Sequence, residues 1–135
     1  MTTEREPWTF LAVLIFTLAA CSTGGPSPSA APGTGLAITA VAGPTCPVET
    51  IPPDPACAPR PVAGATVIIQ DDQRANVATV VLDPQGAAVV ALPAGKYVVQ
   101  PQRVAGLMGT AASANTTVVD GTMTPVVLAY DTGIR

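Results

Sequence analysis

The sequence predicts an all-β domain, a sandwich of about seven strands that occupies the last hundred or so residues. Two observations support this fold class. Short runs rich in valine, isoleucine and threonine recur about every ten residues, with turn-forming residues between them. No window outside the N-terminal segment is long enough for a helix and places apolar residues at helical spacing without β-branched enrichment. We therefore expect almost no helix beyond residue 20.

The strands follow one another with clear turn signals. In chain order they are predicted over residues 36–42, 65–70, 76–82, 87–92, 96–102, 115–119 and 125–130. The clearest turns are Asp71-Asp72-Gln73-Arg74, Asp83-Pro84-Gln85-Gly86, Pro93-Ala94-Gly95 and Asp120-Gly121, which place Asp, Pro and Gly where tight turns favour them.

Alternation along the strands predicts which side chains face the core. In the last strand Val126, Leu128 and Tyr130 share one face, which we expect to point inward. By the same argument Tyr97 and Val99 point inward, because glutamines occupy the alternate positions of their strand. These two tyrosines are the only aromatic residues after residue 20, so the predicted core is small and mostly aliphatic.

The N-terminal segment has the features of an export signal. Residues 8–20 form an apolar run of 13 residues, shorter than the roughly 20 that span a bilayer but typical of a signal peptide. The run ends in Leu18-Ala19-Ala20-Cys21, which resembles the lipobox of bacterial lipoproteins. Arg5 is the one cationic side chain before this run, so the positive charge expected at the start of a signal peptide is unusually small. The resemblance implies cleavage before Cys21, acylation of Cys21 with palmitate and related chains, and an extracytoplasmic protein anchored in the cell membrane or at the cell surface.

The domain organisation follows from that motif. Residues 1–20 are the predicted signal peptide, residues 21–35 the lipidated cysteine with its linker, and residues 36–135 the sandwich. The linker from residue 22 contains only small residues, prolines and glycines and carries no charge, so we expect disorder and a reach of roughly 20 Å. Whether the membrane is an inner or an outer one stays open.

The remaining two cysteines predict a disulfide. Ten residues lie between Cys46 and Cys57, in a stretch rich in proline. The chain has no histidine and no second cysteine pair for a metal site, and their spacing differs from the Cys-x-x-Cys of redox proteins. In an exported protein such a pair forms a disulfide, worth about 3 kcal/mol in the chain-entropy model.

Charge and composition argue against several functions. Without the first 20 residues the chain has seven acidic and five basic residues, a net charge of −2, and no basic run, so we expect no nucleic-acid partner. The absence of histidine excludes Ser-His-Asp and Cys-His nucleophiles, and no glycine-rich phosphate loop is present. Asp71 and Asp72 are conceivable calcium ligands, but as neighbours in a turn we expect them to be solvated. We therefore expect no metal and no cofactor.

Several motifs together resemble a known group of proteins. They are Gly43-Pro44-Thr45-Cys46-Pro47, Leu92-Pro93-Ala94-Gly95-Lys96-Tyr97 and the ending Tyr130-Asp131-Thr132-Gly133-Ile134-Arg135. Small exported bacterial proteins share this ending. The segment 83–97 resembles carboxypeptidase regulatory-like domains, although those usually have an aromatic residue where this chain has Ala88 or Val90. The resemblance implies an Ig-like or prealbumin-like (transthyretin-type) sandwich. It implies no catalytic residues for this chain.

Lys96, the only lysine, raises one further possibility. The predicted fold resembles collagen-adhesin B-type sandwiches, in which a buried lysine can form an isopeptide bond with asparagine or aspartate, helped by an acid. Asn115 and Glu49 are the conceivable partners. Because Lys96 directly follows a tight turn, we expect a solvated side chain instead.

The sequence favours a non-enzymatic binding or structural accessory module of the cell envelope. Its predicted contact site is the loop between the two cysteines, residues 45–60, because a disulfide and prolines preorganise it. The residues expected to make contact there are Thr45, Pro47, Glu49, Asp54 and Arg60. An equally open interpretation is that the disulfide only fastens an edge of the sandwich. Residues 104–113 and 131–135 are secondary candidates, although Asp131 and Arg135 could also pair with each other.

The rival hypothesis is a small carboxylate-dependent envelope enzyme, for example a glycan-acting hydrolase. Such an enzyme needs two carboxyl groups about 5–10 Å apart in a groove. The available acids are Glu49, Asp54, Asp71, Asp72, Asp83 and Asp120, and nothing in the sequence brings two of them together. The partner, an envelope protein or polymer, stays open, as does the oligomeric state.

Overall fold

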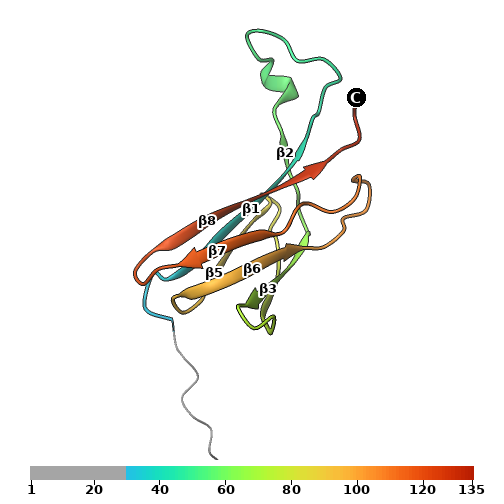
Figure 1. The fold of residues 1–135 in the computed structure, drawn as a ribbon. Helices are drawn as coiled ribbons and strands as arrows, with labels where there is room; N and C mark the ends of the chain where they lie inside the picture. The colour runs from blue at the N-terminus through green and yellow to red at the C-terminus, as the bar shows by residue number, and fades with distance from the viewer. Residues whose placement is uncertain (1–29) are drawn as a thin grey trace, which may run out of the picture.

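The computed structural model describes residues 30–135, which form two packed β-sheets of four strands each (Figure 1). The strands are β1 (Gly35–Gly43), β2 (Arg60–Pro61), β3 (Thr66–Asp71), β4 (Asn76–Val81), β5 (Ala87–Ala91), β6 (Gly95–Pro101), β7 (Ala114–Val118) and β8 (Met123–Asp131). A single turn of 3-10 helix, η1 (Pro55–Cys57), is the only helix of the described part. The predicted signal peptide, Cys21 and most of the linker lie outside the described residues, so the predicted domain boundaries stay predictions.

Strand β1 is the centre of the first sheet. On one side β8 runs parallel to it along its whole length, from the pair Gly35 and Met123 to the pair Gly43 and Asp131. On the other side β1 pairs first with β5, then with the short strand β2 at Val41 and Ala42. Strand β1 therefore leads straight out of the sheet into the loop that contains both cysteines.

The second sheet has the order β4-β3-β6-β7, with all neighbours antiparallel. It covers the inner face of the first sheet, and the side chains between the two sheets are the core. Leu36, Ile38, Val67, Ile69 and Val99 are each no more than 1% exposed. Within residues 30–135 no helix is long and apolar enough to cross a membrane.

The predicted fold class and core orientation are confirmed. Val126, Leu128 and Tyr130 are buried on the inner face of β8, and Tyr97 and Val99 on that of β6. Alternation succeeds here because each sheet has one face on the core and one in solvent.

The strand boundaries differ from the prediction in two informative places. Strand β8 begins at Met123, two residues before the predicted start, and includes Pro125. Proline is tolerated there because β8 pairs with β1 alone and its other edge needs no donor. The eighth strand, β2, was not predicted, since it has only two residues and one of them is Pro61.

The Leu-Pro-Ala-Gly-Lys-Tyr motif is a structural element of the β5–β6 hairpin. Tyr97 is buried, and its hydroxyl donates a hydrogen bond of 2.7 Å to the carbonyl oxygen of Pro93. Gly95 packs against the same side chain, because a Cβ added at this glycine would lie 3.6 Å from the ring carbon Cε2 and from the hydroxyl oxygen of Tyr97. The motif therefore closes the turn over a core tyrosine.

Candidate functional site

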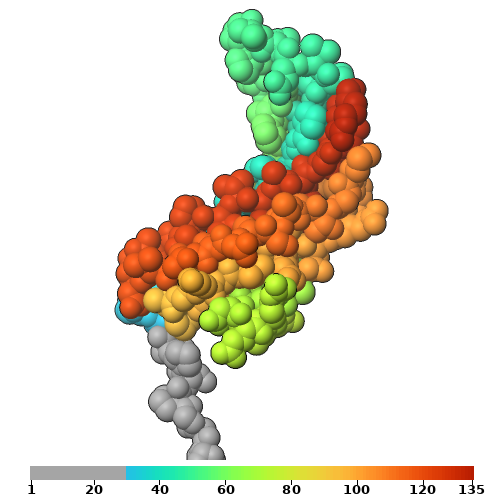
Figure 2. Space-filling view, viewed as in Figure 1, coloured from blue at the N-terminus to red at the C-terminus, as the bar shows by residue number. Residues whose placement is uncertain are grey.

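The cysteine loop, residues 45–60, projects beyond the body of the sandwich. Figure 1 shows it above the ends of β1 and β2, and in the space-filling view of Figure 2 it stands apart from the two sheets. The predicted disulfide is confirmed: Cys46 and Cys57 are bonded, with their Cα atoms 5.3 Å apart. The bond closes residues 46–57 into a ring within the projection.

Two of the predicted contact residues shape the loop instead of pointing free side chains at solvent. The Thr45 hydroxyl donates to the carbonyl oxygen of Ala58 at 3.2 Å, across the base of the ring. The carboxylate of Asp54 accepts a hydrogen bond of 2.8 Å from the backbone N–H of Ala56 and so caps η1. Pro47, Glu49 and Arg60 are exposed.

Two large apolar side chains of the loop are strongly exposed, which the sequence prediction missed. Ile51 is 99% exposed and Val48 is 70% exposed. The sequence contains a sign of this exposed apolar surface, because Val48 and Ile51 lie among prolines and polar residues outside every predicted strand. The tip of the loop is therefore an apolar surface as well as a polar one.

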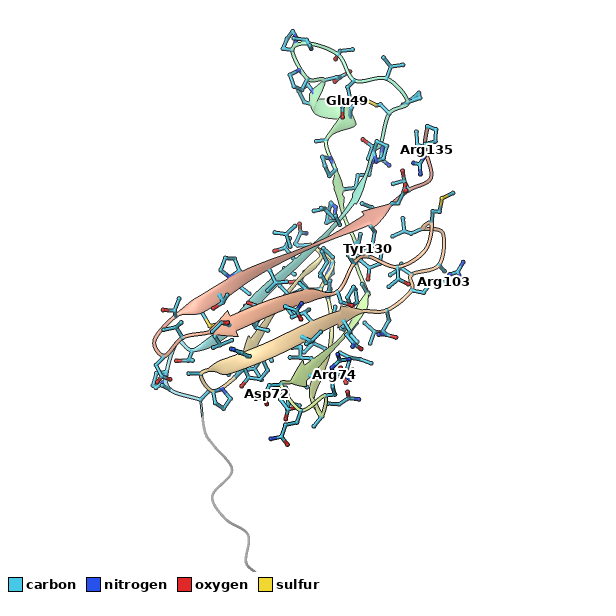
Figure 3. All side chains as sticks on the ribbon, viewed as in Figure 1. Glu49, Asp72, Arg74, Arg103, Tyr130 and Arg135 are labelled. Atoms are coloured by element: carbon cyan, nitrogen blue, oxygen red, sulfur yellow. A yellow bond between two sulfur atoms is a disulfide. The ribbon has the colours of Figure 1, made fainter. Side chains whose placement is uncertain are left out.

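A groove of about 490 Å³ lies at the base of the loop and joins three segments that the sequence presented separately. The cysteine loop contributes Thr45 and Arg60, the segment after β6 contributes Val104 and Leu107, and the C-terminal residues contribute Thr132 and Ile134. Figure 3 shows the labelled Arg103, Tyr130 and Arg135 on this same side of the molecule. All three predicted contact segments thus meet at one end of the sandwich.

Hydrogen bonds fix residues 131–135 beside the loop. The backbone N–H of Thr132 donates to the carbonyl oxygen of Gly43 at 3.2 Å, and its hydroxyl donates to that of Pro44. The backbone N–H of Met108 donates to the carbonyl oxygen of Asp131 at 2.8 Å. Thr132, which forms part of the groove wall, is therefore fixed to residues 43 and 44 on one side, and its neighbour Asp131 is fixed to Met108 on the other.

Asp131 and Arg135 form the ion pair that the sequence left open as an alternative. The guanidinium donates two hydrogen bonds, of 3.1 and 2.8 Å, to the two carboxylate oxygens. Together with the backbone N–H of Gly133, 2.7 Å from one oxygen, this pairing lowers the pKa of Asp131 from its ordinary 3.8 to about 2. Asp131 thus organises the turn formed by residues 131–135.

Two of the other carboxylates are engaged within their own turns. Asp71 and Asp83 each accept hydrogen bonds of 2.9 Å from two backbone N–H groups of their own turns. In Figure 3 Asp72 lies at the opposite end of the body from Glu49. Within residues 30–135 no three acidic, cysteine or histidine side chains gather as metal ligands would.

Glu49 and Asp54 are the acids that come nearest to the enzymatic requirement. Both line a hollow of about 370 Å³ inside the cysteine loop. However, both residues are exposed, and the Asp54 carboxylate already caps η1. The larger groove at the base of the loop has no carboxylate in its lining.

The environment of Lys96 does not match that of an isopeptide-forming lysine. Lys96 is exposed on the outer face of β6, opposite Thr117 of β7. Asn115 lies opposite Val98 on the same exposed face, and Glu49 belongs to the cysteine loop. The solvated side chain expected from the turn position is the arrangement found.

No protein-family model matches the sequence, and no curated protein is significantly similar to it. Solved structures do share its fold. The shaft pilin SpaA from Lactobacillus rhamnosus GG matches with a TM-score of 0.57 at 14% identity, covering 73% of this chain and 51% of that one. GBS52, the minor pilin of Streptococcus agalactiae, matches with a TM-score of 0.56 at 15% identity, covering 73% of this chain and 44% of that one.

A third similar structure is the TIE protein of Bacillus anthracis, with a TM-score of 0.53 and 17% identity. The match covers 73% of this chain and 17% of that one. The chain thus spans about half or less of the length of these three structures. At such identities the likeness establishes the fold, an all-β sandwich of the kind found in pilins.

Proposed function

We propose that this chain is a non-enzymatic surface module, anchored to the membrane through acylated Cys21, whose sandwich presents the cysteine loop to an envelope protein or polymer. The observation that carries the proposal is the position of the loop relative to the start of the domain. Strand β1 begins at Gly35 at one end of the sandwich, and the cysteine loop lies past its other end (Figure 1).

This placement suits a tethered protein. Nine residues of extended chain span about 30 Å, so β1 alone separates the first residue of the domain from the loop by that distance. A chain attached to lipid at Cys21 would hold the loop and the adjoining groove on the side away from the membrane. The predicted linker of residues 22–35 adds further reach.

The chemistry of the distal end suits binding better than catalysis. Ile51 and Val48 offer exposed apolar area on a ring that is already closed by a disulfide, so little conformational entropy is lost when a partner binds. The adjoining groove has apolar walls and one charged lining residue, Arg60. A partner with an apolar segment and an acidic group would complement both features.

The structural neighbours support the same class of function. Two of them are named as a shaft pilin and a minor pilin, which fits a structural or adhesive module at a cell surface. The carboxylate-dependent enzyme is the weaker alternative, since its best pair, Glu49 and Asp54, is solvent-exposed.

The contact role can be tested with a pair of matched variants. Ile51→Asp places a charge on the tip of the loop, and Val119→Asp places the same charge on an exposed valine (58%) beside the β7–β8 turn, away from the loop. We expect envelope fractions to retain the wild-type chain and the Val119→Asp variant, and to retain Ile51→Asp at least tenfold less. Equal retention of all three proteins, or of none, would contradict binding through the loop.

Lipid anchoring is tested separately. Intact mass of the chain isolated from its membranes should show loss of residues 1–20 and added acyl mass on Cys21, and Cys21→Ser should release the protein from the membrane fraction. A chain that remains membrane-bound as Cys21→Ser would refute the anchor without touching the loop hypothesis.

A further inference from the structure

The largest exposed apolar side chains of residues 30–135 gather at one end of the sandwich. This distal end consists of residues 45–60, 104–108 and 131–135. Its exposed apolar residues are Ile51, Val48, Met108 and Ile134, which are 99%, 70%, 60% and 37% exposed. The large apolar residues exposed elsewhere in the described part are all valines on or beside the strands. Because burial free energy scales with apolar area, the distal end offers the strongest apolar contacts to another molecule.

The distal end has a projection and a recess that are both apolar. The tip of the cysteine loop projects Val48 and Ile51, and the groove of about 490 Å³ at the base of the loop has Val104 and Leu107 among its lining residues. Ile51 contacts almost nothing of its own chain, since it is 99% exposed. The tip therefore does not fill the groove of its own chain, and both surfaces are available to a partner.

The projection and the recess also have opposite charges. Glu49 lies on the projecting loop, between Val48 and Ile51 in the sequence (Figure 3), and Arg60 is the one charged residue in the groove lining. The only ion pair within residues 30–135 is that of Asp131 with Arg135, so neither Glu49 nor Arg60 has an ionic partner in the described part of its own chain. A carboxylate beside apolar residues complements a guanidinium beside apolar walls.

We propose that the groove takes the loop tip of a second copy of this chain, with Glu49 of each copy facing Arg60 of the other. A partner for the groove needs an apolar segment and an acidic group, and the chain's own loop tip has both. Because tip and groove belong to the same chain, a single two-fold axis makes both contacts at once. This inference rests on the proposed function for the use of the loop as a contact site, and it names the partner.

The distal end is large enough for a stable pair. It offers about 26 residues on each copy, within the 20–30 residues that a stable interface uses on each side. None of these residues is buried in the single chain. The Cys46–Cys57 bond closes the loop before association, so little conformational entropy is lost when the tip enters the groove.

Charge decides how the two copies are arranged. The loop extends beyond the ends of β1 and β2, so a two-fold axis along β1 would place tip beside tip and bring the two Glu49 carboxylates together (Figure 1). Like charges in contact oppose that arrangement. An axis perpendicular to β1 inverts one copy, so each tip reaches the base of the other loop. The two Gly35 ends then point in opposite directions, and the pair joins chains held at two facing surfaces.

Reversal of the two charges tests the contact. We expect sedimentation equilibrium of the full chain in mild detergent to show a dimer. Glu49→Arg or Arg60→Glu alone should raise its dissociation constant at least tenfold, because like charges then meet at both contacts. An equimolar mixture of the two variants should associate as the parent chain does, since each contact of the mixed pair again joins an acid with a base. The double variant should associate for the same reason.

The matched controls make the same reversals away from the distal end. Asp72→Arg and Lys96→Glu change exposed residues near the β3–β4 turn and at the start of β6. Each should leave the dissociation constant of the dimer unchanged. Rescue by mixing also excludes misfolding of the single variants, because a misfolded chain would not regain the contact.

Three results would overturn the second-copy proposal. They are a parent chain that stays monomeric, single variants that associate as tightly as the parent, and a mixture that associates no better than either variant alone. Envelope fractions from cells that lack this chain separate the inference from the proposed function. Retention there of a chain that stays monomeric would support the loop as a contact site and refute the second copy. A parent chain that dimerises as described but is not retained would support the second copy and refute a different envelope partner.

Discussion

The hydroxyl of Tyr130 donates a hydrogen bond of 2.8 Å to the carbonyl oxygen of Gln102, and this contact joins the two sheets. Tyr130 is on the inner face of β8 in the first sheet, and Gln102 directly follows β6 in the second. The segment that leaves Gln102 then forms one wall of the groove through Val104 and Leu107. A core tyrosine therefore sets the position of a surface segment that belongs to the candidate contact site.

Replacing Tyr130 by phenylalanine should lower the free energy of unfolding by about 1–2 kcal/mol. The ring stays in the core, but the carbonyl of Gln102 loses its side-chain donor. Chemical denaturation measures the change. Tyr97→Phe is the matched control: it loses a hydrogen bond of 2.7 Å to Pro93, so its stability should fall similarly while amide shifts around Val104 stay unchanged. Unchanged stability of Tyr130→Phe would show that the inter-sheet bond contributes little.

The same two tyrosines predict a loss of stability in alkali. Burial raises the pKa of Tyr130 above its ordinary 10, and burial followed by the charges of Asp71 and Asp72 raises that of Tyr97. Because the folded state holds these protons more tightly than the unfolded state, stability is intact below pH 10 and falls as the pH rises through the folded-state pKa values. Thermal unfolding across this range should show the decline, and the double variant Tyr97→Phe, Tyr130→Phe should lack most of it. An equal decline in the double variant would assign the effect to other groups.

Two hairpin turns of the same design differ at one backbone position. In each turn an aspartate carboxylate, Asp71 or Asp83, accepts from the N–H groups two and four residues later. The fourth residue has a positive φ in both, 66° at Arg74 and 70° at Gly86. Arginine is strained in this conformation and glycine is not. Arg74→Gly should therefore stabilise the protein by about 0.5–1 kcal/mol in denaturant unfolding.

The reverse change at the matched turn should have the opposite effect. A Cβ at Gly86 would lie 2.6 Å from the carbonyl oxygen of Ala40 and 2.8 Å from the nitrogen of Val62. Gly86→Ala should therefore lower the free energy of unfolding by about 2 kcal/mol or more. Alanine is strained at this positive φ, and the added Cβ would also force neighbouring backbone atoms to move. Equal responses of Arg74→Gly and Gly86→Ala would contradict the assignment of strain.

Asp131 should titrate well below an ordinary aspartate. Its pKa is lowered to about 2, first by the hydrogen bonds from Arg135 and then by the backbone N–H of Gly133. A lowered folded-state pKa means that the pairing stabilises the C-terminal turn above about pH 4 and is lost as the pH falls toward 2. Carboxyl carbon NMR shifts measure the titration directly. Arg135→Gln should raise the pKa of Asp131 toward 3.8, whereas Arg103→Gln, an equal change of charge, should leave it in place; no response to Arg135→Gln would refute the pairing in solution.

Local patterns predicted much of the fold. The alternation in β6 and β8 identified Tyr97, Val99 and Leu128 as core residues, because a strand with one buried face must alternate. The turns at Asp71 and Asp83 were predictable for a similar reason, since aspartate and glycine favour those backbone conformations wherever they occur. The Cys46–Cys57 bond followed from composition and the expected compartment. Each of these features depends on residues close together in the chain or on chemistry that needs no coordinates.

The candidate contact surfaces were decided by the tertiary structure. The groove depends on contacts such as that of Thr132 with Gly43, which are distant in sequence, and on the parallel pairing of β8 with β1. The outer side of the first sheet likewise exists only because β5, β1 and β8 become neighbours, so that the exposed Val89 and Val127 lie in adjacent rows on either side of β1. A sequence fixes which way each side chain alternates within its own strand, whereas strand order and register decide which alternating faces are placed side by side.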